Sequence, residues 1–300
     1  MGNGVAQKPA RDLCLSVIIV NWNGGEALQS CLRSVFEAAR VPAQVWLVDN
    51  ASSDGSAERA GGAFPSLKLI WNRQNVGFAR AVNQALERSA GEFVLLLNPD
   101  GQIGSEALSS LLAVMDEDGR IGIAGCPSVD ARGRAVPGYE TSFPGRRKEV
   151  VRQTQGPGRD VAWVSGACLL ARRQMVDSIG PLDAGFFMYY EDVDWCLRAR
   201  AGGWRVVTLP KVSVKHELGG SSAHLPRAES ARRAATSRLR FCEKHYSRAR
   251  ARRLALGMAA SALAGILLRS LPAVVSKQAR ARVSCECARL RAVLGPRAPV

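Results

Sequence analysis

The sequence lacks the short motifs that identify several common classes of enzyme. It has no Gly-x-x-x-x-Gly-Lys-Ser/Thr loop, no Gly-x-Gly-x-x-Gly turn after its first apolar segment and no Gly-x-Ser-x-Gly elbow. These absences argue against P-loop nucleotide hydrolysis, a dinucleotide cofactor and α/β-hydrolase chemistry, respectively. Any chemistry must therefore depend on other residues.

Closely spaced cysteines and long apolar runs are also scarce. The eight cysteines are scattered, and only Cys285 and Cys287 lie close together, without a second pair to complete a zinc site. We therefore expect reduced thiols in a cytoplasmic protein. The apolar stretch 13–20 is too short for a signal peptide and is not followed by a cleavage site, so a β-strand explains it better.

Acidic residues are few, because 26 Asp and Glu stand against 41 Lys and Arg and give a net charge of +15. This excess implies an anionic partner: nucleic acid, a phosphorylated substrate or an acidic membrane. Arginine dominates from Arg227 onward. Apart from Phe241 and Tyr246, these arginines are not interleaved with the aromatic residues on which nucleic-acid bases stack. We therefore expect no nucleic-acid partner, although charge alone keeps a nucleic-acid-binding module as an alternative.

The first half of the chain alternates apolar, strand-like segments with segments of helical periodicity. Strands are expected at residues 15–20, 45–48, 67–71, 93–97 and 121–124. This alternation predicts an α/β fold with a parallel sheet covered by helices on both faces. Residues 130–160 are rich in Gly, Pro and Arg and are expected to form an extended loop, and a short helix is expected at 191–200. We expect one domain over residues 1–228 and a basic, then apolar, helical extension over 229–300.

Ligands of such sheets bind beyond the carboxyl ends of the strands. Asn21, Asp49 and Asp100 are expected at these ends. A carboxylate at position 100 could hold Mg²⁺ or Mn²⁺, which share their ligand shell with substrate phosphates. The polar loop 49–55 could hold a base and ribose by hydrogen bonds. The alternatives are a plain Asn-Pro turn and a helix-capping loop.

A second acidic cluster lies beside aromatic residues in the other half of the chain. Glu191 and Asp192 are expected at a helix start, where one could act as a general base because burial beside a like charge raises a carboxyl pKa. The alternative is that the two acids have no catalytic role and only interact favourably with the helix dipole at the start of the helix. Asp194 and Arg198 are four residues apart and are expected to pair as a brace. His216, which precedes a Gly-Gly-Ser-Ser segment at 219–222, could complete a metal shell.

Seven short stretches, in this order, resemble family 2 glycosyltransferases of the GT-A fold, in particular bacterial rhamnosyltransferases that build surface polysaccharides. They are residues 17–23 (VIIVNWN), 48–56 (VDNASSDGS), 75–79 (NVGFA) with Asn83, 97–100 (LNPD), 165–167 (SGA), 185–194 (GFFMYYEDVD) with Arg198, and 214–216 (VKH) with Ser221. Each is weak alone, but their order over about 205 residues is specific. Residues 1–14 and 230–300 lie outside the resemblance.

The resemblance implies an inverting glycosyltransferase that uses a nucleotide diphosphate sugar. The residues that it assigns to donor binding are Asn21, Asn23, Asp49, Asp54, Asn75, Gly77, Asn83 and Asn98. Asp100 would hold the Mg²⁺ or Mn²⁺ ion, Asp192 would be the catalytic base, and Glu191 would support it. Asn98 replaces the first acid of the family's Asp-x-Asp-type motif, which makes His216 more important as a ligand.

By the same resemblance, dTDP-rhamnose is the expected donor, while UDP-galactofuranose and UDP-glucose stay open. The acceptor is expected to be a glycan or a lipid-linked glycan. A nucleotidyltransferase is the other alternative, although the segment 21–24 has no Arg or Lys for a phosphate loop. The sequence does not predict an oligomeric state.

The basic C-terminal extension suggests that the protein contacts a membrane. Residues 254–268 are apolar and are flanked by arginines, but a spanning helix needs about 20 apolar residues. The region 254–275 could lie on the membrane, span it, or pack on the catalytic domain. A basic flank suits an anionic surface, so we expect peripheral contact with the cytoplasmic face of the inner membrane.

Overall fold

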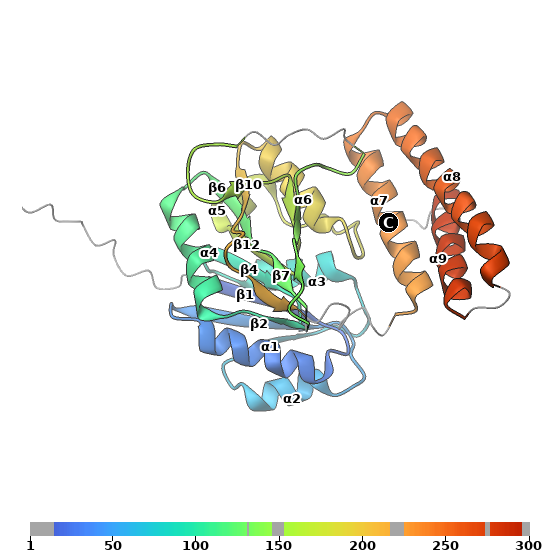
Figure 1. The fold of residues 1–300 in the computed structure, drawn as a ribbon. Helices are drawn as coiled ribbons and strands as arrows, with labels where there is room; N and C mark the ends of the chain where they lie inside the picture. Colours follow the sequence, from blue (N-terminus) through green and yellow to red (C-terminus); the bar gives the residue numbers. More distant parts are fainter. Residues whose placement is uncertain (1–14, 131, 146–152, 217–224, 274–276, 296–300) are drawn as a thin grey trace, which may run out of the picture.

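The computed structural model describes residues 15–130, 132–145, 153–216, 225–273 and 277–295 (Figure 1). Cys14, the segment 219–222 and His224 lie outside the described residues. The seven cysteines within them are free thiols.

An eight-stranded sheet forms the centre of the fold, in the order β10-β13-β6-β12-β4-β1-β2-β3. Its strands are β1 (Leu15–Asn21), β2 (Ala43–Asp49), β3 (Lys68–Trp71), β4 (Phe93–Leu97), β6 (Ile121–Gly125), β10 (Arg159–Asp160), β12 (Cys168–Arg172) and β13 (Arg205–Thr208). The five strands expected in the first half are β1, β2, β3, β4 and β6. The predicted α/β architecture is confirmed.

Six helices cover the two faces of this sheet (Figure 1). They are α1 (Gly25–Ala38), α2 (Ser56–Ala63), α3 (Phe78–Arg88), α4 (Ser105–Glu117), α5 (Arg173–Ile179) and α6 (Glu191–Ala201). Alternate residues of β1 serve opposite faces, since Val17 and Ile19 pack with α1, α2 and α4, whereas Ile18 and Val20 pack with α3, α5 and α6. A strand buried on both faces is mostly apolar, as β1 is from Val17 to Val20.

The sheet is mostly parallel, as the resemblance to the GT-A fold implies, but it departs from the fully parallel sheet that the strand–helix alternation predicts. β12 runs antiparallel to both neighbours, β4 and β6, and β10 is antiparallel to β13. The region 130–160 is also not only a loop, because it contributes short strands to the edge of the sheet and to two small sheets. The additional strands are β5 (Gly101–Gln102), β7 (Ser128–Val129), β8 (Ala135–Val136), β9 (Tyr139–Glu140), β11 (Trp163–Val164) and β14 (Val214–His216). Two-residue strands are too short to leave a periodic signal.

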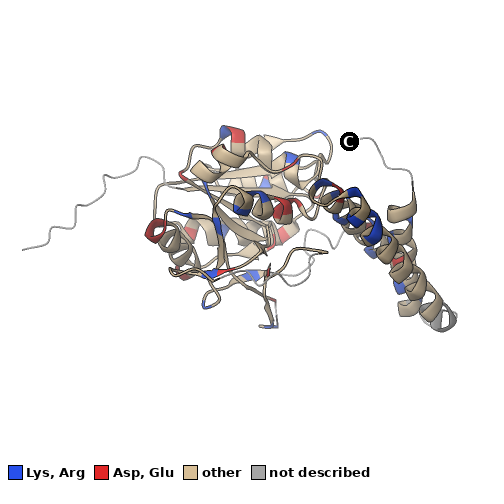
Figure 2. Ribbon diagram, turned by 90° about the horizontal axis from the view of Figure 1, so that it is seen from above, with Lys and Arg blue, Asp and Glu red and all other residues tan. Residues whose placement is uncertain are grey.

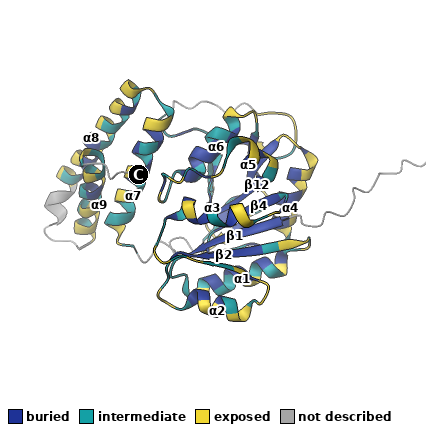
Figure 3. Cartoon of the chain, turned by 180° about the vertical axis from the view of Figure 1, so that it is seen from behind, coloured by how far each residue is buried: buried dark blue, intermediate teal, exposed yellow. Residues whose placement is uncertain are grey.

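The C-terminal helices pack together beside the sheet domain (Figure 1). They are α7 (Arg227–His245), α8 (Arg248–Ala273) and α9 (Lys277–Leu294), and α7 lies nearest to the sheet domain (Figure 1). Within α8, the segment Arg248–Leu268 is long and apolar enough to cross a membrane by length and composition alone. Much of its outer surface is exposed (Figure 3).

Candidate functional site

The register of β1 and β2 creates the first polar group of the site. Parallel pairing sets Asn21 opposite Asp49 at the carboxyl ends of both strands. The Asn21 amide donates to Asp49 Oδ1 at 2.9 Å. It also lies 3.0 and 2.9 Å from the hydroxyl oxygens of Ser52 and Ser56. Asn21 and Asp49 are both buried, so these contacts fix the shape of the loop that follows β2.

Asn23 and Asp54 lie further out in the same pair of loops. Asn23 Oδ1 accepts a hydrogen bond of 2.8 Å from the Ser53 amide. Asp54 accepts hydrogen bonds from the Gly25 amide at 2.9 Å and from the Ser56 hydroxyl at 2.6 Å. Burial acts to raise the pKa of Asp54, but the hydrogen bonds from Ser56 and Gly25 outweigh it and lower the pKa. Asp54 is therefore an exposed, ionised carboxylate beside the loop.

Asn50 connects β2 to the next loop and lines the central cavity. Its amide nitrogen donates to Asn75 Oδ1 at 3.1 Å and to the Gly77 carbonyl at 3.3 Å. Its Oδ1 accepts from the Asn72 side chain at 3.0 Å and from the Val76 amide at 3.2 Å. These four contacts hold the loop that carries Asn75 and Gly77 against the sheet.

Gly77 allows this loop to approach a distant segment. Its φ is +88°, and a Cβ here would lie 2.5 Å from the Phe187 carbonyl oxygen. The Phe78 amide donates to that oxygen at 2.7 Å. A residue with a side chain would separate the two segments. Nearby, Asn83 exchanges hydrogen bonds of 2.8 and 3.2 Å with the Leu182 backbone, so it holds the same segment against α3.

Asn98, Asp100 and His216 meet beyond the end of β4. Pairing of β14 with β5 sets His216 opposite Gly101. Asp100 Oδ1 lies 3.0 Å from His216 Nε2, and Asn98 Nδ2 lies 3.3 Å from the same nitrogen. Two neighbouring ligands of an octahedral ion, each about 2.1 Å from it, are about 3.0 Å apart. Asp100 and His216 are hydrogen-bonded to each other here, and they are also close enough to be neighbouring ligands of one divalent cation.

The described residues contain no group of three His, Cys, Asp or Glu that could hold a metal by itself. The two protein donors suit a cation that takes its remaining ligands from substrate phosphates and water, as Mg²⁺ commonly does. Asn98, which occupies the position of the first acid in the family's Asp-x-Asp-type motif, makes the group of donors less negative than two carboxylates would.

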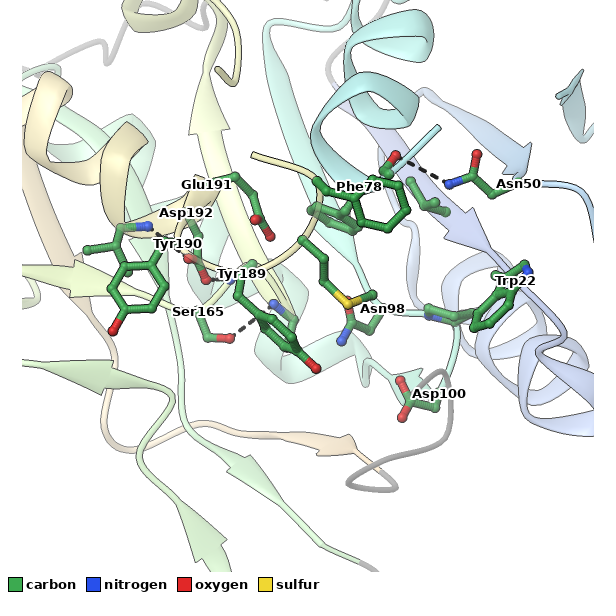
Figure 4. Close-up of a pocket in the computed structure, with 18 of the residues that line it drawn as sticks. Trp22, Asn50, Phe78, Asn98, Asp100, Ser165, Tyr189, Tyr190, Glu191 and Asp192 are labelled. Carbon is green, nitrogen blue, oxygen red and sulfur yellow. Dashed lines mark hydrogen bonds between the residues drawn. The ribbon is translucent and has the colours of Figure 1, made fainter. Parts of the chain in front are cut away.

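Glu191 and Asp192 begin α6 on the opposite side of the cavity from Asp100 (Figure 4). Asp192 Oδ2 accepts from the Gly166 amide at 2.8 Å, and its Oδ1 accepts from the Val193 amide at 2.8 Å. Glu191 is 6% exposed, and its Oε2 has no hydrogen-bond partner among the described residues. Burial raises the pKa of both carboxyls, and the Asp192 charge raises that of Glu191 further. The pKa of Glu191 is therefore raised more than that of Asp192, so Glu191 is the member of the pair that favours the protonated form.

The two residues before α6 have unusual backbone conformations. Tyr189 and Tyr190 both have φ of 69°, although neither is glycine. Such conformations cost free energy and persist where the surroundings enforce them, often at functional sites. The Tyr190 ring packs 5.8 Å from the Phe241 ring of α7. The strained turn thus leads directly into the pair of carboxylates.

Asp194 has a structural role. It is fully buried and lies 2.9 Å from Arg198, 2.7 Å from Lys244 and 2.6 Å from His245. Burial acts to raise the pKa of Asp194, but hydrogen bonds from His245, Lys244 and then Arg198 lower it to about 2. The expected Asp194–Arg198 brace is confirmed. Because Lys244 and His245 belong to α7, Asp194 also joins α6 to the C-terminal helices.

One cavity of about 430 Å³ brings several of these groups together (Figure 4). The expected site residues that line it are Asn75, Gly77, Asn98, Asp100, Glu191, Asp192 and His216. The remaining expected residues do not line it: Asn21 and Asp49 end β1 and β2, Asn23 and Asp54 lie in the loops that follow, and Asn83 is on α3. The structure therefore brings the metal-binding and base candidates into one site.

The cavity also contains residues that were not singled out from the sequence. Examples are Trp22, Asn50, Phe78, Gly166 and Tyr189. Trp22 and Asn50 are each next to a residue that was singled out, and Gly166 lies within the matching stretch 165–167. These positions in the sequence could have identified all three. Tyr189 also lies within a matching stretch, 185–194, but its left-handed backbone conformation was not predicted.

Comparison with known proteins relates this site to a family. A family model described as glycosyl transferase family 2 matches residues 16–180. The N-acetylglucosaminyl-diphospho-decaprenol L-rhamnosyltransferase of Mycobacterium tuberculosis (strain ATCC 25618 / H37Rv) is 28% identical over 261 residues, which cover 77% of this chain and 85% of that protein. The dTDP-rhamnosyl transferase RfbF of Shigella flexneri is 24% identical over 214 residues, which cover 69% and 70%.

Solved structures of glycosyltransferases share the fold. The mannosyltransferase PcManGT from Pyrobaculum calidifontis, in complex with GDP-Man and Mn²⁺, has a TM-score of 0.59 at 18% identity, covering 97% of this chain and 89% of that one. TarS 1–349 from S. aureus has a TM-score of 0.56 at 17% identity, covering 95% and 92%.

The family model covers more than half of the chain, from β1 to α5, and α6 with Glu191 and Asp192 follows it. This match decides between the glycosyl and nucleotidyl transfer considered above. The resemblance inferred from the seven stretches is confirmed: the chain belongs to glycosyl transferase family 2 and is a glycosyltransferase with the GT-A fold.

Proposed function

We propose that this glycosyltransferase moves L-rhamnose from dTDP-rhamnose to a hydroxyl of a lipid-linked glycan during surface-polysaccharide synthesis, with inversion at the anomeric carbon. Two of its similar curated relatives are named as rhamnosyltransferases, and one of these names contains a diphospho-decaprenol acceptor. The observation that carries the proposal is the arrangement of one cavity, with the Asp100–His216 pair at one side and Asp192 at the other.

The Asp100 side of the cavity suits the diphosphate of the donor. Asp100 and His216 would hold Mg²⁺ or Mn²⁺, and the bound cation would neutralise charge that develops on the departing nucleoside diphosphate. Asn75 and Gly77 line the same cavity, close to Asn50. Asn21 and Asp49 are buried, so in this proposal they shape the donor loop rather than contact the donor. Asn23 and the ionised Asp54 are more accessible and are candidates for contact with the nucleoside.

The Asp192 side suits activation of the acceptor. As the acceptor oxygen bonds to the anomeric carbon, the bond from that carbon to the phosphate oxygen breaks and Asp192 takes the hydroxyl proton. The Gly166 and Val193 amides fix the Asp192 carboxylate. Glu191 keeps its own proton and so does not add a second negative charge. Attack from the face opposite the leaving group inverts the configuration.

A screen of donors tests this proposal directly. The purified full-length chain is heated with dTDP-rhamnose, UDP-galactofuranose or UDP-glucose, each with Mg²⁺ or Mn²⁺. A ligand that binds the folded state raises the melting temperature according to its affinity. We expect the largest rise with dTDP-rhamnose and a smaller rise when the cation is withheld. A larger rise in melting temperature with a UDP-sugar would make that sugar nucleotide the donor in place of dTDP-rhamnose. No rise with any donor would contradict the proposed function.

Peripheral membrane contact is a separate part of the proposal. From Arg227 to the end of the chain, 17 Lys and Arg accompany only 3 Asp and Glu, and basic residues are frequent on the three C-terminal helices (Figure 2). Leu263 and Leu267 on α8 are 47% and 71% exposed. An apolar face with basic flanks suits the anionic, cytoplasmic face of the inner membrane.

Vesicle sedimentation tests this contact. Replacing Leu263 and Leu267 by Glu should remove most binding to anionic vesicles, because two carboxylates enter the apolar face. Leu294 on α9 is 67% exposed, so Leu294→Glu makes the same chemical change elsewhere and should have a smaller effect. Equal binding by the double variant and the original chain would contradict the assignment of this face.

A further inference from the structure

A second cavity lies between the three C-terminal helices. Its volume is about 560 Å³, and α7, α8 and α9 all contribute to its wall. Small side chains occupy much of this wall: Ala231, Ala234 and Ala235 on α7, and Gly257, Ser261 and Ala262 on α8. Small residues on adjacent helices leave space between them, and a space of this size is typical of a binding site for a small molecule. We call it the helical groove.

Two arginines give the helical groove a positive charge. Arg238 of α7 and Arg253 of α8 line it, and neither has a hydrogen bond or an ion pair with another residue in the described part of the chain. In contrast, Arg289 is bonded to Glu286 at 3.1 and 3.2 Å. A guanidinium without a carboxylate partner is suited to bind a phosphate through two parallel hydrogen bonds.

Tyr190 links the helical groove to the catalytic cavity, because it lines both. The residues that follow it are Glu191 and Asp192. Tyr190 and Arg238 both line the helical groove, and the positive charge of Arg238 opposes the rise in the Tyr190 pKa that burial causes. A phosphate bound at Arg238 would therefore have its attached group next to the candidate base.

We infer that the helical groove binds the lipid end of the acceptor, which is an isoprenyl diphosphate that carries the accepting sugar. The isoprenyl chain lies along the small side chains, the diphosphate contacts Arg238 and Arg253, and the sugar passes Tyr190 to reach Asp192. Leu256, which precedes Gly257, is 67% exposed, so the apolar surface of α8 continues from the groove toward solvent. This inference rests on the proposed lipid-linked acceptor.

Filling the groove provides the first test. An added Cβ at Gly257 meets no atom within 4 Å, and leucine favours a helix more than glycine does, so Gly257→Leu should fold and occupy the groove. Ala260 is on the exposed side of α8 and does not line the groove, so Ala260→Leu is the matched control. The probe is farnesyl diphosphate, and its Kd for the full-length chain is measured by calorimetry. We expect Gly257→Leu to weaken binding roughly tenfold or more, because it displaces much of the buried chain, and Ala260→Leu to have no more than about a twofold effect.

Removing one charge provides the second test. Arg253→Gln takes away a groove arginine, whereas Arg252→Gln removes an exposed neighbour of equal charge that does not line the groove. Losing a charged hydrogen bond to the diphosphate should weaken farnesyl diphosphate binding roughly tenfold in Arg253→Gln only. Inorganic pyrophosphate should bind more weakly than farnesyl diphosphate, since it lacks the chain. Both variants should bind anionic vesicles equally, because membrane attraction depends on their equal net charge.

Equal binding of farnesyl diphosphate by all four variants and the original chain would overturn this inference. So would binding of pyrophosphate as tight as that of farnesyl diphosphate, because the groove would then add nothing. These outcomes are distinct from failure of the proposed function. If the proposed function is wrong, the unaltered chain, whose donor-binding residues are all present, will show no rise in melting temperature with any nucleotide sugar.

Discussion

Replacing Asp192 by Asn separates its role as a base from its role in the fold. Asn has nearly the same shape, and its carbonyl oxygen can still accept the 2.8 Å hydrogen bond from the Gly166 amide, although its amide nitrogen cannot accept the one from the Val193 amide. The variant therefore keeps the turn at the start of α6 but cannot take a proton from an acceptor hydroxyl. We expect transfer to fall while donor binding survives.

The structure sets the size of each effect. A positioned general base contributes about 10²- to 10⁴-fold, which is about 3–5 kcal/mol in the barrier. Donor affinity should stay within about twofold, because Asp100 and His216 lie across the cavity from the substitution. Folding should change little, because two effects oppose each other. Burial disfavours the charged form of Asp192, so neutralising it is favourable, whereas the hydrogen bond from the Val193 amide is lost.

Three measurements check this reasoning on the same preparations: transfer of labelled sugar to a lipid-linked acceptor, donor affinity by calorimetry, and thermal melting. Asp54→Asn is a matched control, because Asp54 is also a carboxylate but does not line the cavity. It should change donor affinity more than the rate at saturating donor. Turnover by Asp192→Asn within tenfold of the original would remove Asp192 from the role of base. A large fall in melting temperature would show that the substitution disturbs the fold and not only the proton transfer.

Three further results are expected. Asp194→Asn should lower the free energy of unfolding at neutral pH by about 2–3 kcal/mol, because its pKa is about 2 in the folded state and about 3.9 when unfolded. The stabilisation by Asp194 is fully present above the pKa of the unfolded state and is lost as the pH falls through the pKa of the folded state. Denaturant titrations should therefore give free energies of unfolding for the variant and the original chain that converge between about pH 5 and pH 2. A difference that stays constant over this range would be inconsistent with this cause. Excess chelator should stop transfer until Mg²⁺ or Mn²⁺ is added, and His216→Ala should need more cation for half-maximal activity; full activity in chelator would rule out the Asp100 site. Gly77→Ala should destabilise the fold by about 1–3 kcal/mol, since it combines an unfavourable φ with contact at the Phe187 carbonyl, and an unchanged melting temperature would show that the loop can move away.

The sequence predicts most of the central sheet because its strands are buried on both faces. Val17 to Val20, for example, is apolar without interruption, which distinguishes a covered parallel strand from a surface one. The direction of β12 is not predictable in this way. An antiparallel strand between β4 and β6 has the same apolar composition as a parallel one, and its direction depends on the connections between strands.

The candidate site was predictable in part for a related reason. Asp100, Glu191 and Asp192 carry chemistry that is recognisable in isolation, and all three line the cavity. Asn21 and Asp49 also have suitable chemistry, but the exact register of β1 and β2 makes them partners of each other. Sequence spacing shows that polar groups share one edge of the sheet, whereas only coordinates show which of them satisfy one another.

The antiparallel β12 also has a consequence for the order in which the protein can fold. β4 ends at Leu97, but its neighbour on one side is not complete until Arg172, and β6 needs both β12 and β13, which ends at Thr208. During synthesis from the N-terminus, one edge of β4 therefore remains open while more than seventy further residues are made. Contacts between such distant segments form slowly, and open strand edges are prone to intermolecular pairing. A nascent chain of this protein is thus most vulnerable to aggregation in the interval between β4 and β12, and truncations within that interval should be recovered as aggregates rather than as soluble fragments.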